Sequence, residues 1–384
     1  MLELKNCNVF LDEDSLGELG AMLDADKHHS ILLVTGSASY EASGARLLLA
    51  PLLEGREVTR VFDFQTNPQK SDLCRILDEI SGINFSAIIA VGGGSVIDVA
   101  KLIKCFRQAS DQIDKVLCSD REAKPSSAAL FALPTTAGSG SEATQFAVLY
   151  DGAVKHSIAH PKLLPDAAWL LPSILSSVPR DIAAAAALDA FCQGVESYWS
   201  IHSTDESKNL ARRAICLTWE FMLPAVIDHD KAAIREMAKA ACLAGMAINL
   251  TKTTAPHALS YALTIHFGLM HGHAVGLMLP DIYKYNEAVG NEDVLDHRGV
   301  EYVRRVMTEI AMMLSCSSVT DAAEAIRERI KNLGLPNSLS AAGITNKKQH
   351  ELIIKDGFNP DRVNNNPRKL SIQGLHSILA VTSK

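Results

Sequence analysis

The chain contains 384 residues, of which 47% are hydrophobic, and its 37 basic and 44 acidic side chains give a formal net charge of −7. This length predicts two domains with buried cores, and the lack of a basic block argues against a nucleic-acid partner. No apolar run reaches the ~20 residues that a membrane-spanning helix requires, so we expect no membrane association.

The eight cysteines are widely scattered and form no CxxC pair. The N-terminal sequence MLELKNCNVF lacks the pattern of a signal peptide. We therefore expect free thiols in a reducing cytoplasm and no disulfide framework.

The first half of the chain alternates strand and helix patterns, which predicts an α/β fold with a doubly wound parallel sheet. The expected strands are residues 30–35, 58–64, 86–91 and 128–133, and helical patterns between them include residues 71–80 and 96–106. An Asp151-Gly152 turn between residues 145–150 and 153–158 predicts a β-hairpin.

The second half changes character, because strand patterns vanish from about residue 176 onward. Long stretches rich in Ala, Leu, Ile and Met carry helical periodicity instead. The expected helices are residues 181–200, 208–226, 232–249, 255–267, 300–314 and 320–332. Pro172 and Pro179 mark the junction, so we place the domains at residues 1–176 and 177–384.

A glycine-rich loop, Gly92-Gly93-Gly94-Ser95, follows one expected strand and opens a helix. Glycines let the backbone approach a pyrophosphate closely, and the helix N-terminus offers unpaired N–H groups to the phosphates. Ser95 and Asp98 have the spacing of a capping box. A glycine turn with an ordinary helix cap is the structural alternative to a phosphate site.

Two further loops follow expected strands and can line the same cofactor. The segment at residues 134–142 carries Thr135, Thr136, Ser139 and Ser141, although a flexible linker could have the same composition. Where an acidic side chain would bond a ribose 2′-hydroxyl, the first loop has Gly36, flanked by Ser37 and Ser39. Small hydroxyl residues accommodate a 2′-phosphate, which favours NADP(H) over NAD(H) unless the ribose is read elsewhere.

Four residues of the helical half form a candidate metal-binding set. Asp189 and Gln193 are four apart, which places both side chains on one face of a helix. His257 and His271 are fourteen apart, which fits about four helical turns or two converging elements. One carboxylate, one amide oxygen and two imidazoles suit Zn²⁺ or Fe²⁺. A structural salt bridge is the alternative for Asp189, and the adjacent Cys192 points away from Gln193 on a helix.

Several motifs together resemble the iron-containing (type III, metal-dependent) alcohol dehydrogenase family over nearly the whole chain. The matching segments are GGGSVIDVAK at 92–101, LPTTAGSGSEAT at 133–144, KHSIAHPKLLPD at 155–166, LDAFCQGVES at 188–197, residues 255–280 and NNPRKL at 365–370. The resemblance implies an N-terminal dinucleotide-binding α/β domain, an all-helical metal-binding C-terminal domain and at least a homodimer.

The same resemblance implies site residues, position by position. Asp189, His257 and His271 match the family's metal ligands, whereas Gln193 stands where the family usually has His, and Tyr261 stands where a further His is often found. The residues expected at the dinucleotide are Gly36, Ser37, Ser39, Asn67, Gly92, Gly93, Gly94, Ser95, Asp98, Thr135, Thr136, Ser139, Ser141 and Lys155.

The segment at residues 249–261 resembles the subgroup that contains phosphonoacetaldehyde reductases, which form 2-hydroxyethylphosphonate during phosphonate biosynthesis. Lys252, with Thr253 and Thr254, offers a cation and hydroxyls to an oxyanion. The alternative is a solvated helix-start lysine followed by capping threonines. Arg368 is a weaker candidate for the anion, since a structural arginine fits as well. His266 and His273 are expected to be hydrogen-bonded structural histidines.

These observations predict a metal-dependent, NAD(P)H-linked aldehyde reductase. The metal, Fe²⁺ or Zn²⁺, would polarise the aldehyde oxygen, and Tyr261, water or a cofactor hydroxyl would supply the proton. Three alternatives stay open: a general short-chain alcohol or diol dehydrogenase, a dehydroquinate-synthase-like lyase or cyclase, and a binding protein that has lost its metal through Gln193.

Overall fold

The computed structural model describes residues 2–4, 7–26, 28–152, 154–358 and 363–382. The chain separates into two compact units, Met1–Val178 and Pro179–Lys384. The sequence-based boundary at 176/177 lies two residues earlier. Among the described residues, no helix is long and apolar enough to cross a membrane.

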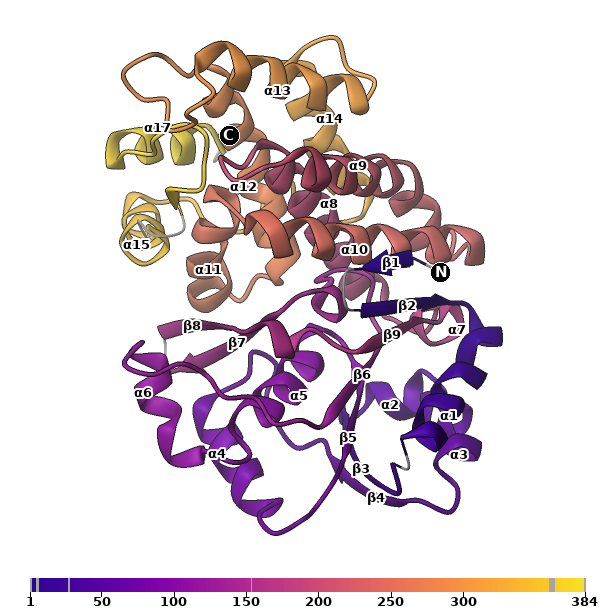
Figure 1. Cartoon of the computed structure of the whole chain (residues 1–384). Helices are drawn as coiled ribbons and strands as arrows, with labels where there is room; N and C mark the ends of the chain where they lie inside the picture. Colours follow the sequence, from indigo (N-terminus) through magenta and orange to yellow (C-terminus); the bar gives the residue numbers. More distant parts are fainter. Residues whose placement is uncertain (1, 5–6, 27, 153, 359–362, 383–384) are drawn as a thin grey trace. The chain divides into compact units, whose positions relative to one another are not determined.

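Unit 1 is built on a seven-stranded sheet in the order β1-β2-β9-β6-β5-β3-β4 (Figure 1). All neighbouring pairs are parallel except β1 with β2, which confirms the expected parallel sheet and adds an antiparallel edge strand. The strands are β1 Leu2–Leu4, β2 Cys7–Leu11, β3 Ser30–Thr35, β4 Glu57–Val61, β5 Ala87–Gly92, β6 Ala129–Pro134 and β9 Ala167–Leu170.

Helices fill the connections between these strands. They are α1 Leu16–Ala25, α2 Ser39–Ala42, α3 Ala45–Leu53, α4 Lys70–Glu79, α5 Gly94–Phe106, α6 Ile113–Leu117 and α7 Pro172–Leu175. The predicted hairpin is confirmed as β7 Phe146–Asp151 and β8 Val154–Ala159, which pair antiparallel outside the main sheet.

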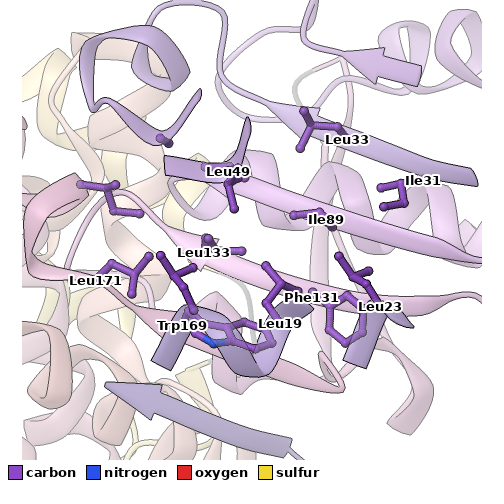
Figure 2. Close-up of a cluster of buried hydrophobic side chains, with 14 of the residues drawn as sticks. Leu19, Leu23, Ile31, Leu33, Leu49, Ile89, Phe131, Leu133, Trp169 and Leu171 are labelled. Atoms are coloured by element: carbon purple, nitrogen blue, oxygen red, sulfur yellow. The ribbon is translucent and has the colours of Figure 1, made fainter. Parts of the chain in front are cut away.

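The core of unit 1 forms because its central strands are apolar on both faces, as parallel strands covered by helices must be. Every residue of β5 is buried. Figure 2 shows one of the two covered faces, where Leu23 of α1 and Leu49 of α3 lie over Leu33, Ile89 and other strand residues. The predicted strand at 58–64 ends earlier, at Val61, whose pairing with Val34 is the last between β4 and β3, and β3 is the one strand that pairs with β4 among the described residues.

The strand order reverses direction at β3, and this places three loops side by side. β3 connects to β4 on one side, and the chain then returns to β5 on the other side of β3. Thr35 lies opposite Val91, and Val91 lies opposite Leu133, so β3, β5 and β6 end at the same level. Open α/β sheets bind ligands at such a switch point, outside the carboxyl ends of the strands.

Unit 2 is helical, and its only β pairing among described residues is an isolated bridge between Val294 and Arg368. Its helices are α8 Arg180–Trp199, α9 Asp205–Val226, α10 Lys231–Thr251, α11 Ala255–Phe267, α12 His271–Glu287, α13 Val300–Met313, α14 Val319–Asn332, α15 Lys347–Gly357 and α17 Ile372–Thr382. The alanine-rich α8 is buried from Ala187 to Trp199, because small side chains let α9, α10 and α12 pack closely around it.

Candidate metal and cofactor sites

Three side chains from three helices of unit 2 converge. Asp189 of α8, His257 of α11 and His271 of α12 each offer one ligand atom, and these atoms all lie within 4.8 Å of one another. His257 Nε2 is 3.2 Å from Asp189 Oδ1, and the two imidazole ring centroids are 5.3 Å apart. The fourteen-residue spacing therefore reflects two helices that converge, since the turn at 268–270 separates α11 from α12.

Gly272 allows α12 to reach α8. A Cβ atom on Gly272 would lie 1.9 Å from the Ala185 carbonyl oxygen and 2.7 Å from Asp189 Cβ, both on α8. Only a residue without a side chain permits this approach. The neighbouring His271 is brought beside Asp189 by this close helix crossing.

Glu196 supports His257 from behind, and sequence reasoning missed it. Its Oε1 accepts a hydrogen bond from His257 Nδ1. Its Oε2 accepts from the Thr254 backbone N–H at 2.6 Å and from the Thr254 hydroxyl at 2.9 Å. Glu196 is fully buried. A carboxylate bonded to Nδ1 leaves Nε2 to a metal, and this arrangement is usual for metal-binding histidines.

The electrostatics of the cluster suit a cation. Burial by itself lowers the pKa of His257, but the Glu196 and Asp189 carboxylates outweigh it and raise that pKa to about 10. Burial raises the pKa of Asp189, yet hydrogen bonds from His257 and Gln193 and the His271 charge hold it below its ordinary value. The pocket therefore keeps its carboxylate ionised and favours positive charge.

In unit 1, the glycine-rich loop lies at the end of β5 and opens α5. Its helix begins at Gly94 with Gly93 as the N-cap and no side-chain cap, so the predicted capping box between Ser95 and Asp98 is wrong. Asp98 points elsewhere: its carboxylate accepts from the Ser141 hydroxyl at 2.7 Å and from the Val148 N–H at 3.2 Å. Burial raises the pKa of Asp98.

The loop after β6 packs against the glycine-rich loop. A Cβ atom on Gly94 would lie 2.6 Å from the Ser139 hydroxyl, and one on Gly93 would lie 3.2 Å from the Thr136 hydroxyl. Thr135 N–H donates to Gly92 O at 3.0 Å. The backbone of each loop therefore reaches the other, as two walls of one phosphate site would.

Other expected cofactor residues lie on the same loops or on the hairpin. Asn67, which has a positive φ of 64°, donates its N–H to the Ser95 hydroxyl at 3.3 Å. Lys155 is on β8, partly exposed, and its charge acts on Asp98. Gly36 and Ser39 are in close contact, since a Cβ on Gly36 would lie 2.2 Å from the Ser39 hydroxyl, and Ser37 is exposed between them.

Comparison with known proteins identifies the family to which the chain belongs. Residues 7–172 match the iron-containing alcohol dehydrogenase domain, and residues 183–382 match the C-terminal domain of the same family. The chain belongs to the iron-containing alcohol dehydrogenase family. It is 34% identical over 339 residues to a phosphonoacetaldehyde reductase of Streptomyces viridochromogenes, which covers 84% of this chain and 82% of that protein.

Two further relatives of this chain have names that state different substrates. A sulfoacetaldehyde reductase of Bifidobacterium kashiwanohense, solved in complex with NAD⁺, superposes with a TM-score of 0.87 at 26% identity and covers 100% of this chain and 99% of that chain. An NAD-dependent methanol dehydrogenase of Bacillus methanolicus is 27% identical over 319 residues, 82% of each protein. The predicted family and fold class are confirmed.

The side chains of the Asp189–His257–His271 cluster fit a metal ion. Two imidazoles and a carboxylate are the ligand types that Zn²⁺ and Fe²⁺ accept in catalytic sites. Gln193, one turn after Asp189 on α8, is buried and hydrogen-bonded to that carboxylate. Cys192 is also buried on α8 but is absent from the ligand cluster, and burial raises its pKa well above the ordinary value, so it stays a neutral thiol.

His273 and His266 are held by protein groups. His273 Nε2 is 2.7 Å from the Pro336 carbonyl oxygen in a buried position, and His266 Nε2 is 2.7 Å from Asp356 Oδ2 near the surface. Tyr261, in contrast, stacks on His271 with parallel rings 5.7 Å apart. Tyr261 thus lies against the ligand cluster, where the family often has another histidine.

The Lys252 segment differs from its predicted form. Lys252 is the C-cap that follows α10, so it is not a helix-start lysine, and its φ of 59° is one that non-glycine residues rarely adopt. Its side chain is exposed. The Thr254 hydroxyl donates to Glu196 and accepts from Trp199 Nε1 at 2.8 Å, so it is committed to the support of His257. Thr253 contributes its carbonyl to Asn365 Nδ2 at 3.1 Å.

Arg368 has a structural role. Its Nε donates to Asp293 Oδ2 at 2.6 Å, its Nη1 donates to the Tyr285 carbonyl oxygen at 2.6 Å, and its guanidinium lies 3.9 Å from the Tyr285 ring centroid. These three contacts account for the arginine and leave Lys252 as the candidate cation for a substrate anion.

Proposed function

We propose that this alcohol dehydrogenase reduces a small acidic aldehyde, phosphonoacetaldehyde, to the primary alcohol 2-hydroxyethylphosphonate with a reduced nicotinamide dinucleotide. The observation that carries the proposal is the Asp189–His257–His271 cluster, buttressed by Glu196, in a chain related to a phosphonoacetaldehyde reductase. The homodimer expected from the sequence belongs to the same proposal, and light scattering of the purified protein tests it.

Asp189, His257, His271 and Gln193 would hold the divalent ion, which as a Lewis acid polarises a carbonyl oxygen. Glu196 holds the proton of His257 on Nδ1 and thereby directs Nε2 toward Asp189. The Tyr261 hydroxyl is the candidate that delivers a proton to the alkoxide, since its ring is fixed against His271. In this role the stacking of Tyr261 on His271 orients the donor before the reaction begins.

In unit 1, the loops after β5 and β6 would hold the dinucleotide. Gly92, Gly93 and Gly94 let the backbone approach a pyrophosphate, and the N-terminus of α5, which has no side-chain cap, would face it. Thr135, Thr136 and Lys155 complete the expected contacts. We propose NADP(H), because no acidic residue stands at 36–39 to accept a ribose 2′-hydroxyl. The NAD⁺ bound by the sulfoacetaldehyde reductase makes NAD(H) the competing cofactor.

Lys252 would bind the anionic end of the substrate. A non-glycine residue at φ 59° carries a backbone cost of about 1–3 kcal/mol, and such outliers persist where the surroundings require them. The segment that follows Lys252 is anchored by Thr254 to Glu196. A lysine at this place can select phosphonate- or sulfonate-bearing aldehydes over neutral ones, because its exposed positive charge favours an anionic partner.

The test compares kcat/KM for phosphonoacetaldehyde, sulfoacetaldehyde and propanal with the Fe²⁺- and Zn²⁺-loaded enzyme. We expect phosphonoacetaldehyde to exceed propanal by at least about tenfold, and Lys252→Gln to abolish most of this preference while propanal turnover is unchanged. Lys347→Gln, an exposed lysine of α15, is the matched control. A wild type with no preference for the acidic aldehydes would refute the substrate and favour a general short-chain alcohol dehydrogenase.

Sulfoacetaldehyde is the second candidate substrate, favoured by the sulfoacetaldehyde reductase among the structural relatives. A higher kcat/KM for sulfoacetaldehyde would assign the sulfonate instead. Oxidation of one dinucleotide per aldehyde would exclude a lyase or cyclase that recycles its cofactor. One bound ion per chain with turnover would exclude a metal-free binding protein.

A further inference from the structure

The guanidinium of Arg60 lies beside the first loop at the carboxyl edge of the sheet. Arg60 is on β4, where it is paired in register with Leu33 of β3. Its Nε donates to the Thr35 hydroxyl at 2.9 Å, and Thr35 is the last residue of β3, directly before Gly36. A positive charge is therefore fixed one residue from the position that should read the adenosine ribose.

Aromatic rings hold this guanidinium in place. Its central carbon lies 4.6 Å from the centroid of the buried Tyr40 ring and 4.6 Å from that of Phe62. Stacking on two rings together with a hydrogen bond from Nε leaves the side chain little freedom. Arg60 is thus ordered in advance, so a bound anion would not have to immobilise a flexible chain.

The terminal nitrogens of the Arg60 guanidinium make no close ion pair with the residues that the structure describes. Among the residues the structure describes, the closest acidic approach to its terminal nitrogens is from Nη1 to Glu41 Oε1 at 3.9 Å. That carboxylate is held more closely by Arg46, whose Nε is 2.7 Å away. The Arg60 side chain is 28% exposed. Two arginines and one glutamate give this corner a net positive charge.

The order of strands in the sheet places the Arg60 charge where the ribose of a bound dinucleotide is expected. The pyrophosphate is expected at the end of β5, and β3 is the neighbour of β5 on the side of the sheet that ends in β4. In doubly wound folds the ribose 2′ position is read at the strand next to the pyrophosphate strand, by an acid for a hydroxyl and by an arginine for a phosphate. Here the strand-end position is Gly36, and the fixed side chain beside it is Arg60.

We propose that Arg60 binds the 2′-phosphate of the dinucleotide and sets a preference for NADP(H). This inference rests on the proposed dinucleotide function of unit 1 and assigns a residue to its specificity. The planar guanidinium can donate two parallel hydrogen bonds to one phosphate. Ser37 and Ser39 of the adjoining loop are small enough to leave the phosphate room.

Binding measurements that need no turnover test the proposal. Calorimetry compares adenosine 2′,5′-diphosphate, which carries the 2′-phosphate, with 5′-AMP, which differs only in lacking it. We expect the wild type to bind the 2′,5′-compound more tightly than 5′-AMP. Arg60→Gln should weaken binding of the 2′,5′-compound by about ten- to a hundredfold and leave 5′-AMP binding unchanged, because only the bonds to a charged group are lost. Arg60→Lys keeps the charge without the bidentate geometry and should fall between the two.

Arg107→Gln is the matched control. Arg107 also lies over an aromatic ring, 3.6 Å from the Phe85 centroid, and donates to the Ile83 and Phe85 carbonyl oxygens before β5, at the opposite edge of the sheet. It should alter neither affinity, and thermal melting checks that each variant is folded.

Equal binding of the 2′,5′-compound by wild type and Arg60→Gln would overturn the role of Arg60 while the dinucleotide site stands. Tighter binding of 5′-AMP than of the 2′,5′-compound by the wild type would overturn it in favour of NAD(H). If neither compound binds, the dinucleotide function of unit 1 fails together with it.

Discussion

Gly272→Ala should dismantle the metal cluster without touching a ligand. The new Cβ would lie 1.9 Å from the Ala185 carbonyl oxygen, whereas real Cβ contacts are essentially never under 3.0 Å. The α8 and α12 backbones must therefore separate locally by about 1 Å, while metal–ligand distances tolerate only about ±0.2 Å. We expect metal affinity to fall by at least about a hundredfold, which is the upper range for loss of a supporting group.

The same substitution should change stability much less. Overpacking costs ~1–3 kcal/mol, and the better helix propensity of alanine returns up to about 1 kcal/mol. The assay is competition for Zn²⁺ against a chelator of known affinity, with melting of the metal-free protein alongside. Gly276→Ala is the control, because the nearest atom to its Cβ would be the flexible end of Leu188 at 3.3 Å, and its next contacts, at 3.6 and 3.7 Å, are of ordinary van der Waals length. Wild-type metal affinity in Gly272→Ala would refute the argument that this glycine sets the ligand geometry.

Three further changes test the buried polar groups. Glu196→Gln keeps the shape of the side chain, but its amide would donate to His257 Nδ1 and move the ring proton to Nε2, the nitrogen that would bind the metal. Metal affinity should therefore fall ~10–100-fold in the chelator assay. An unchanged affinity would contradict the supporting role of Glu196. Lys101 is fully buried and donates to three carbonyl oxygens of residues 141–146 at 2.7–2.8 Å. Lys101→Met should lower the free energy of unfolding, measured in urea, by at least about 3 kcal/mol. A decrease below about 1 kcal/mol would contradict this role of the lysine. Burial raises the pKa of Glu142 from 4.5 to about 7. Between these two pH values the folded state keeps a proton on Glu142 that the unfolded state has lost, so the free energy of unfolding should fall by about 3 kcal/mol as pH rises from 4.5 to 7. Glu142→Gln should flatten this fall, and an unchanged pH profile would refute the cause.

Much of the fold follows from local patterns. The bounds of β3 and of α11 match the sequence-based expectation residue for residue, because apolar runs and helical periodicity are strong there. The strands β2 and β9 were not predicted: they are short, and pairing with each other across the chain stabilises them. Helix α12 was also not predicted, since Pro280 and its glycines weaken local propensity and packing against α8 decides its structure.

Part of the candidate site could also be predicted from the sequence, and part could not. The spacing of Asp189, His257 and His271 could be read from the sequence, and the structure brings these residues together. Glu196 could have been found, because it lies seven residues after Asp189 on the same helical face, two turns along. Arg60 could not, since its relation to Gly36 arises only from the neighbouring register of β3 and β4. The Ser95–Asp98 capping box failed because Asp98 bonds the distant Ser141 instead.

Restoration of activity by titrated metal tests the central claim most directly. Chelator-treated protein is titrated with Fe²⁺ or Zn²⁺ while phosphonoacetaldehyde-dependent NADPH oxidation is followed and bound metal is quantified. The account predicts no turnover without metal, linear recovery that saturates at about one ion per chain, as a catalytic mononuclear site requires, and no recovery in His271→Ala. Full turnover by protein shown to be free of metal, or undiminished recovery in His271→Ala, would contradict it.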